Sequence, residues 1–204
     1  MDWSYDFIRK YGVMYEEDYP YTSGTTPTEG TCLHEETLID KKVKTYSQVA
    51  VDPYAIRKEL KKGPLAVTMA FGQGLMQYKS GVIPASDSTY CSARLNHALT
   101  IVGYNTGSDT TQREETKDVT TCRRRFKKDR PECRFDGEFI WGNGKYCCKT
   151  EESIVEISDG ANWLIQNQWG TGWGEQGFLR AAFNEGSGVC GINVETWSVK
   201  HKDF

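Results

Sequence analysis

The sequence has no apolar run that approaches the roughly 18 residues of a membrane-spanning helix. It also has little excess charge, since 25 basic and 28 acidic residues leave a formal net charge of −3. This balance gives no electrostatic basis for binding nucleic acid or a membrane surface. Histidine is scarce, with three residues in 204, so few positions can supply an imidazole. We expect one protein core with neither nucleic acid nor a membrane as partner.

The first residues, M-D-W-S, lack the basic flank and apolar segment of a secretory signal peptide. Seven cysteines in a chain of this size nevertheless indicate an oxidising compartment. These two observations conflict. We interpret the chain as the mature form, or an incomplete sequence, of a secreted or vesicular protein.

One stretch near the C-terminus, residues 162–174, reads N-W-L-I-Q-N-Q-W-G-T-G-W-G. An apolar strand leads into Asn167, and two tryptophans, Trp169 and Trp173, follow it. Tryptophan rings are usually buried, so they can shelter a polar amide from water. An Asn in such a place can orient a catalytic base. His97 is the matching base, because it alone among the histidines lies in an apolar strand pattern, L-N-H-A-L-T-I-V-G-Y.

Local patterns predict several secondary-structure elements. Residues 2–11 form a helix whose apolar stripe is Trp3, Phe7 and Tyr11, with Gly12 as its stop. Asp52 and Pro53 begin a short helix that extends to about residue 62. The pattern also predicts strands at 43–51 and 65–70, a loop or helical turn at 73–80 and a short edge strand at 81–84.

Several motifs, in order, resemble the papain-like, cathepsin-type cysteine peptidases. They are E-E-D-Y-P-Y at 16–21, N-H-A at 96–98 with V-G-Y at 102–104, N-x-W-G-x-x-W-G from 167, G-F-L-R at 177–180 and G-V-C-G-I at 188–192. The resemblance implies an α+β, papain-like fold that consists mainly of the right-hand antiparallel β-barrel domain. It implies a remnant helix of the left domain at 1–12, barrel segments at 13–104 and 162–204, and a charged, cysteine-rich insertion at 105–161.

The resemblance assigns roles to four residues. His97 is the general acid and base, and Asn167 orients it. Trp169 shields their hydrogen bond, and Trp173 lines the leaving-group side. The family's nucleophile signature, a Gln shortly before C-G-x-C-W, occurs nowhere in the 204 residues. We therefore expect an N-terminally truncated copy of a cysteine endopeptidase, inactive by itself because it lacks the nucleophilic Cys and the oxyanion Gln.

The resemblance also implies a disulfide between Cys91 and Cys190, and an S2 pocket formed by Thr68, Leu95 and Glu195. A carboxylate at Glu195 would admit Arg as well as apolar side chains. The alternative for Glu195 is an exposed surface residue.

Cys32 matches a family half-cystine whose partner lies outside the chain. The alternative is a free or intermolecular thiol.

The segment between His97 and Asn167 is long, since the two residues are 70 apart and the family has roughly 20. It contains a basic run at 123–128 and four cysteines, Cys122, Cys133, Cys147 and Cys148. We favour a disulfide-stapled loop, because a segment this polar cannot build its own core. A zinc site and the docking of an anionic partner are the alternatives.

By resemblance, the chain needs no cofactor and no metal. Its partners are peptide or protein substrates, and a propeptide or cystatin-like inhibitors. Its location is lysosomal or secreted. The rival hypothesis is a non-catalytic homologue that binds a partner through the insertion. The stripe of residues 3, 7 and 11 should be uncovered in this chain, so we expect aggregation or a molten character when it is expressed alone.

Overall fold

The computed structural model describes residues 1–22, 24–26, 28–39, 43–85, 88–107, 113–124, 137–141, 144–157 and 160–201. The helices are α1 (Asp2–Tyr11), α2 (Pro53–Leu60) and α3 (Gln73–Met76), with short 3-10 turns η1 (Glu36–Leu38), η2 (Ser88–Tyr90) and η4 (Val189–Gly191). The strands are β1 (Val43–Gln48), β2 (Leu65–Met69), β3 (Val82–Ile83), β4 (His97–Asn105), β5 (Arg113–Arg124), β6 (Gly137–Trp141), β7 (Gly144–Ile157), β8 (Asn162–Gln166), β9 (Phe178–Ala182) and β10 (Thr196–His201).

The chain forms two compact units. The smaller contains Met1–Tyr46 and the C-terminal residues from Val199, and the larger is Ser47–Ser198. The boundaries expected from the sequence at residues 12, 104 and 161 stay a prediction.

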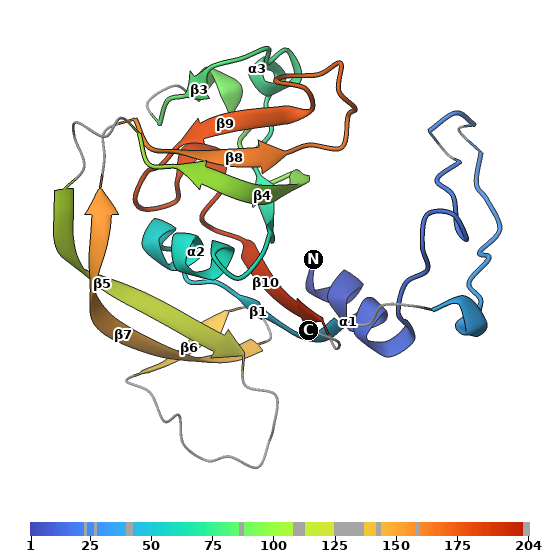
Figure 1. The fold of residues 1–204 in the computed structure, drawn as a ribbon, viewed down its shortest axis with the longest axis horizontal. Helices are drawn as coiled ribbons and strands as arrows, with labels where there is room; N and C mark the ends of the chain where they lie inside the picture. Colours follow the sequence, from blue (N-terminus) through green and yellow to red (C-terminus); the bar gives the residue numbers. More distant parts are fainter. Residues whose placement is uncertain are drawn as a thin grey trace. The chain divides into compact units, whose positions relative to one another are not determined.

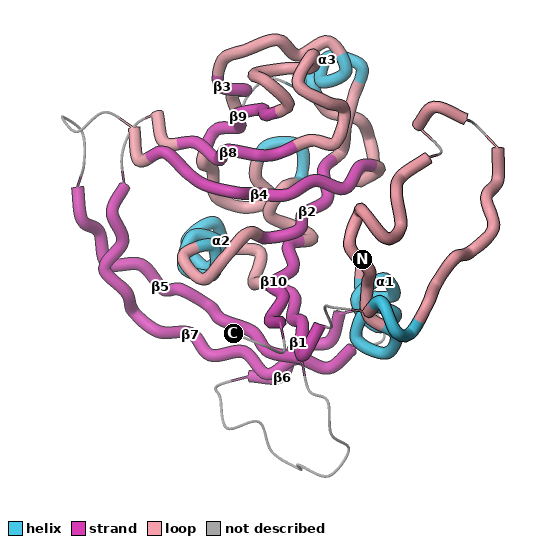
Figure 2. Tube along the Cα trace, turned by 45° about the vertical axis from the view of Figure 1, so that its right-hand side comes forward, coloured by secondary structure: helices cyan, strands magenta, loops and turns pink. Residues whose placement is uncertain are grey.

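The main sheet has the strand order β1-β10-β2-β4-β8-β9-β3 (Figure 1). Neighbouring strands from β10 to β9 are antiparallel, as the sequence led us to expect. The edge strand β3 differs, because it runs parallel to β9. In the larger unit, α2 lies beside β4 in both views (Figures 1 and 2). Helices and a mostly antiparallel sheet confirm the α+β class.

Strands β4 and β8 are direct neighbours, with Asn105 opposite Asn162 at their shared end. Strands β5, β6 and β7, which lie between them in the sequence, form a separate antiparallel sheet in the order β5-β7-β6 (Figure 2). We had expected a stapled loop here. The runs V-T-T in β5 and I-V in β7 consist of β-branched residues, which favour strands even without a core of their own. Cys133 and the side chains of Cys122, Cys147 and Cys148 lie outside the described residues, so their pairing stays a prediction.

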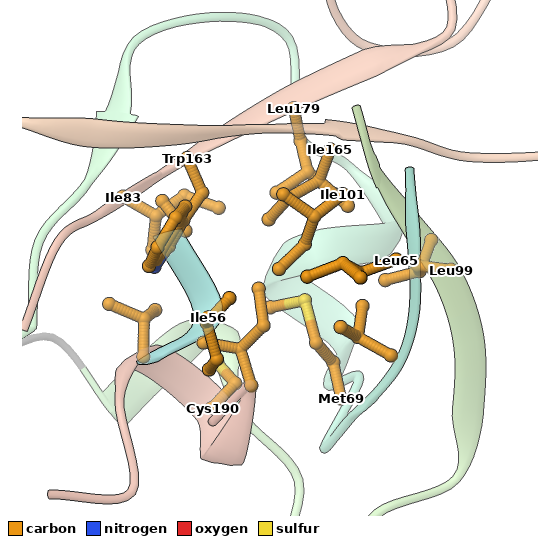
Figure 3. Packing of buried hydrophobic residues seen from close by; sticks show 14 of the residues in the cluster. Ile56, Leu65, Met69, Ile83, Leu99, Ile101, Trp163, Ile165, Leu179 and Cys190 are labelled. Atoms are coloured by element: carbon orange, nitrogen blue, oxygen red, sulfur yellow. The ribbon is translucent and has the colours of Figure 1, made fainter. Parts of the chain in front are cut away.

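The core of the larger unit lies against one face of the main sheet. Alternate residues of β2, Leu65, Val67 and Met69, are at most 1% exposed, as the period of a strand with one buried face requires. Figure 3 shows side chains from β2, β4, β8, β9 and α2 converging on the same space. Trp163 and Ile165 of β8 are fully buried there. This packing holds the ends of β4 and β8 in fixed positions.

The short helices begin and end as their sequences predict. The side chain of Asp52 caps α2 by accepting the Tyr54 N–H at 3.0 Å, and Pro53 occupies the first turn. Helix α1 ends at Gly12, whose φ of 82° is a conformation that favours glycine.

Helix α1 contacts the rest of the smaller unit through two faces, because Phe7 and Tyr11 of its stripe contact His34 and a second face contacts Tyr46. Tyr5 and Arg9 pack on Tyr46 of β1, at 5.3 Å between the tyrosine rings and 5.7 Å from the guanidinium to the ring. Burial raises the pKa of Tyr5 to about 12. Trp3 and Phe7 of the stripe are 85% and 51% exposed, which confirms that the stripe is uncovered in this chain.

A disulfide joins Cys91 to Cys190, as the resemblance implied, across 99 residues of chain. It ties the loop before β4 to the η4 turn. Cys32 is a free and exposed thiol in this structure.

We predict that replacing Trp3 and Phe7 by Gln reduces self-association of the isolated chain. Both rings are mainly in water, so the change removes apolar surface and little packing. Analytical ultracentrifugation of the original and the double variant measures the effect. An original chain that is already monomeric, with a sharp thermal transition, would contradict the prediction.

We also predict that replacing both Cys91 and Cys190 by Ala lowers the free energy of unfolding by roughly 4–5 kcal/mol, because a loop of about 100 residues is no longer closed in the unfolded chain. Urea unfolding measures the change, and Cys32→Ala is the matched control without a disulfide. An equal loss in the control would show that the effect is not due to the cross-link.

Candidate active site

His97 and Asn167 come together at one end of the β4–β8 pair. His97 is the first residue of β4, and Asn167 follows the last residue of β8. Nε2 of His97 lies 3.0 Å from Oδ1 of Asn167. Asn167 is 7% exposed, so this hydrogen bond is largely protected from water. The structure thus joins the two residues that the sequence selected from positions 70 apart.

The hydrogen bonds of Asn167 determine where the His97 proton lies. Oδ1 of Asn167 also accepts the backbone N–H of Gln168 at 2.9 Å, which identifies this atom as the oxygen. An oxygen acceptor requires that Nε2 of His97 carries a proton and donates it. Neutral His97 therefore keeps its lone pair on Nδ1. That is the atom available for accepting a proton from a reacting group.

Aromatic rings surround the imidazole. The Trp169 ring centroid is 5.1 Å from that of His97, and Trp173 is 5.5 Å from Trp169. The Trp173 indole is oriented by its N–H, which donates to the Met76 carbonyl at 3.1 Å. Phe71 has the shortest ring separation from His97, 4.6 Å. Our sequence reasoning missed Phe71, because a phenylalanine after an apolar strand is indistinguishable from an ordinary core residue.

The carboxylate of Glu175 holds the loop after Trp173. It accepts two hydrogen bonds from the Arg180 guanidinium, at 2.8 and 2.9 Å, one from the Gly81 N–H at 2.8 Å and one from the Tyr78 hydroxyl at 3.1 Å. The Arg180 hydrogen bonds are the main cause that lowers the pKa of Glu175 from 4.5 to about 2. Burial, above all, raises the pKa of Tyr78 to about 12. Since the Tyr78 ring also contacts Trp173 at 5.7 Å, this network supports the indole.

The three residues expected to form a pocket lie on neighbouring segments. Thr68 donates its hydroxyl to Glu195 Oε2 at 2.8 Å, and the backbones of the same two residues are hydrogen-bonded at 3.1 Å. Leu95 is 37% exposed and lies against the backbone of Gly191, where a Cβ would come within 2.9 Å of its side chain. Thr68 and Glu195 are therefore in direct contact, and Leu95 is adjacent to the segment that precedes Glu195.

The described residues contain neither a cluster of metal ligands nor a membrane-spanning helix. In that part of the chain, no three His, Cys, Asp or Glu side chains form a group that could hold a metal ion. Among the same residues, no helix is long and apolar enough to cross a bilayer. The cysteine side chains described are the Cys91–Cys190 disulfide and Cys32, which belongs to the smaller unit.

The model of the papain family of cysteine proteases matches residues 1–123 and 142–199. This chain belongs to that family. Among curated members, it is 27% identical over 195 residues to the cathepsin L-like proteinase of Fasciola hepatica, with 94% of this chain and 42% of that protein covered. It is 30% identical to the probable cysteine protease RD19B of Arabidopsis thaliana, covering 89% of this chain and 36% of the relative.

Solved papain-family structures share the fold. Bromelain from Ananas comosus, in complex with the E64 inhibitor, superposes with a TM-score of 0.63 at 22% identity, covering 97% of this chain and 67% of that one. Procathepsin L 3 from Tenebrio molitor gives a TM-score of 0.64 at 21% identity, covering 98% and 47%. The chain spans less than two thirds of the length of its first curated relatives.

We predict that Glu175→Gln lowers stability at neutral pH and flattens its acid dependence. Because folding depresses the pKa of Glu175, its contribution to the free energy of unfolding is complete above pH 4.5 and is lost as the pH falls toward 2. We expect the substitution to lower the free energy of unfolding at pH 7 by about 1–2 kcal/mol. The effect is limited because water screens the Arg180 side chain, which is 37% exposed. Urea unfolding between pH 7 and pH 3 measures the change.

The control is Asp6→Asn, which breaks the exposed ion pair with Arg9. This pair should contribute little, because both side chains are more than 40% exposed. An acid dependence that is the same in Glu175→Gln as in the original chain would contradict the prediction.

Proposed function

We propose that this chain supplies the acid–base half of a cysteine endopeptidase that hydrolyses peptide bonds by a Cys-His-Asn mechanism. The nucleophilic Cys and the oxyanion-binding Gln would lie outside the 204 residues. The observation that carries the proposal is the 3.0 Å hydrogen bond from His97 Nε2 to Asn167 Oδ1. It orients the ring so that Nδ1 is the nitrogen available to a substrate and a thiol.

The geometry suits two successive proton transfers. Nδ1 of His97 accepts the thiol proton, which leaves a thiolate beside an imidazolium. The thiolate attacks the peptide carbonyl to form a thioester, and Nδ1 returns the proton to the amine that leaves as the C–N bond breaks. Water then hydrolyses the thioester, which releases the acid and restores the thiol. Asn167 accepts the Nε2–H in both states, so the ring need not turn between the steps. In this proposal, Trp169 shields this bond and Trp173 lines the leaving-group side.

We further propose that Thr68, Leu95 and Glu195 form the S2 pocket. A carboxylate at the pocket floor would pair with the guanidinium of an Arg side chain. The Thr68 hydroxyl supports this role, because its 2.8 Å hydrogen bond holds the carboxylate in one position. Leu95 would contact the apolar part of the bound side chain.

The family and the disulfide support an oxidising location. We propose that the protein is lysosomal or secreted. Its substrates would be peptides or proteins, and its partners a propeptide or cystatin-like inhibitors. A non-catalytic homologue that binds a partner through the insertion is the alternative that the following experiment would reveal.

In the product of the complete coding sequence, we predict that His97→Ala lowers kcat/KM for a fluorogenic peptide by about 10²–10⁴-fold, the usual value of general acid–base catalysis. A thiol-alkylating reagent should abolish the activity. His34→Ala is the control histidine, which packs on Phe7 and Tyr11 in the smaller unit. The proposal is wrong if the complete protein does not cleave the peptide, or if its kcat/KM is unaffected by His97→Ala.

We predict that Glu195→Gln in the same protein selectively lowers kcat/KM for substrates with Arg at P2. Phe at P2 should be cleaved about as well as before, because it does not need the carboxylate. The ratio of the two kcat/KM values measures the effect. If the ratio does not change, Glu195 is a surface residue and the pocket assignment is wrong.

A further inference from the structure

Phe71 lies two residues after β2 and forms the buried side of the aromatic enclosure around His97. Its side chain is 3% exposed, whereas Trp169 is 42% exposed. Its ring centroid is 4.6 Å from His97, 5.2 Å from Trp169 and 6.1 Å from Trp173. Phe71 therefore contacts the imidazole and both indoles from one side. Trp169 by itself leaves part of the site open to water.

The backbone of Phe71 is fixed directly to the residue that precedes His97. Its N–H donates to Asn96 Oδ1 at 2.7 Å, and its carbonyl accepts from Asn96 Nδ2 at 3.0 Å. Phe71 also forms an isolated β-bridge with Cys91, whose disulfide ties it to Cys190. These contacts hold the ring in a constant position relative to the start of β4.

The position of this ring has two physical consequences for His97. The torsion that turns an imidazole about its Cβ–Cγ bond has broad minima, so the ring needs packing on its face to stay in one plane. The hydrogen bond to Asn167 is also worth more where water is excluded, since water competes for the same donor and acceptor. Replacing Phe71 by a small residue would open space beside the imidazole and weaken both constraints.

We propose that Phe71 is a positioning residue for His97, which sets the imidazole plane and keeps water from the Nε2–H···Oδ1 hydrogen bond. It does not touch substrate, because it is buried, and it acts through His97. The inference rests on the proposed function only in its consequence for proton transfer. The geometric effect on His97 can be measured without hydrolysis.

The test measures exchange of the His97 Nε2 proton with water by NMR of the chain with ¹⁵N-labelled histidine. Trp3→Gln and Phe7→Gln are included to limit self-association, since both residues belong to the smaller unit. We expect a protected Nε2–H signal in this background. Phe71→Ala should speed its exchange about tenfold, which corresponds to the net value of one hydrogen bond. Phe71→Leu, which restores apolar volume, should recover part of the protection.

The matched control is Phe183→Ala. Phe183 packs on Trp163 at 4.8 Å and Tyr54 at 5.3 Å, away from His97, so its loss should lower stability and leave the exchange unchanged. Asn96→Ala is a second test that creates no cavity in the core, and it should speed the exchange by releasing the Phe71 backbone. Equal exchange in Phe71→Ala, Asn96→Ala and Phe183→Ala would overturn the proposal and leave Phe71 as a core residue.

The two proposals fail in distinguishable ways. Faster exchange in Phe71→Ala together with an inactive complete protein would refute the peptidase and retain the positioning role. Activity that depends on His97, together with unchanged Nε2–H exchange in Phe71→Ala, would support the peptidase and refute the positioning role of Phe71. In an active protein, Phe71→Ala should lower kcat more than it changes KM, because the bound substrate does not contact the ring.

Discussion

The pairing of β4 with β8 determines where the candidate catalytic groups lie. His97 begins one strand and Asn167 follows the other, so their hydrogen bond forms only if the two strands are in register. A slip by one residue would turn the alternating side chains to the opposite face. Trp163 and Ile165 prevent such a slip, because both are fully buried in the core and would be exposed by it. The core thereby controls the geometry of a site at its edge.

Two further interactions keep the surroundings of His97 in place. The Asn96 side chain connects the His97 segment to Phe71, and the four hydrogen bonds to Glu175 fix the loop that carries Trp173. Both use a short polar side chain to join backbone segments that are distant in sequence. The aromatic rings then fill the space between these segments. An arrangement of this kind limits ring motion more firmly than apolar packing by itself, since hydrogen bonds are directional.

The sequence was most informative where the signal is local or belongs to a motif. Helix α1 and its glycine stop follow from spacing, and the Asp52 cap follows from residue type. The Cys91–Cys190 disulfide and the approach of His97 to Asn167 came from the family resemblance. The face by which α1 contacts Tyr46 was not predicted, because a tyrosine and an arginine do not stand out against a stripe of larger apolar residues.

Phe71 and the sheet of the insertion were missed for a different reason. The importance of Phe71 depends on tertiary contacts that no spacing encodes. The β5-β7-β6 sheet was expected as a loop, because its polar composition concealed the β-branched runs. Strand pairing there follows from backbone hydrogen bonds and a matching partner strand, and neither can be read from hydropathy.

The insertion between β4 and β8 also has a kinetic consequence. Bringing His97 to Asn167 closes a loop of 70 residues. Each doubling of loop length adds about 0.6 kcal/mol to the free-energy cost of closing the loop. The increase from the family's roughly 20 residues to 70 therefore costs only about 1 kcal/mol. The greater sequence separation of the contacts still slows the search for the correct pairing. Strands β5, β6 and β7 pair with one another inside the insertion, so they can form before β4 meets β8. This would shorten the effective loop and bring the two halves of the site together.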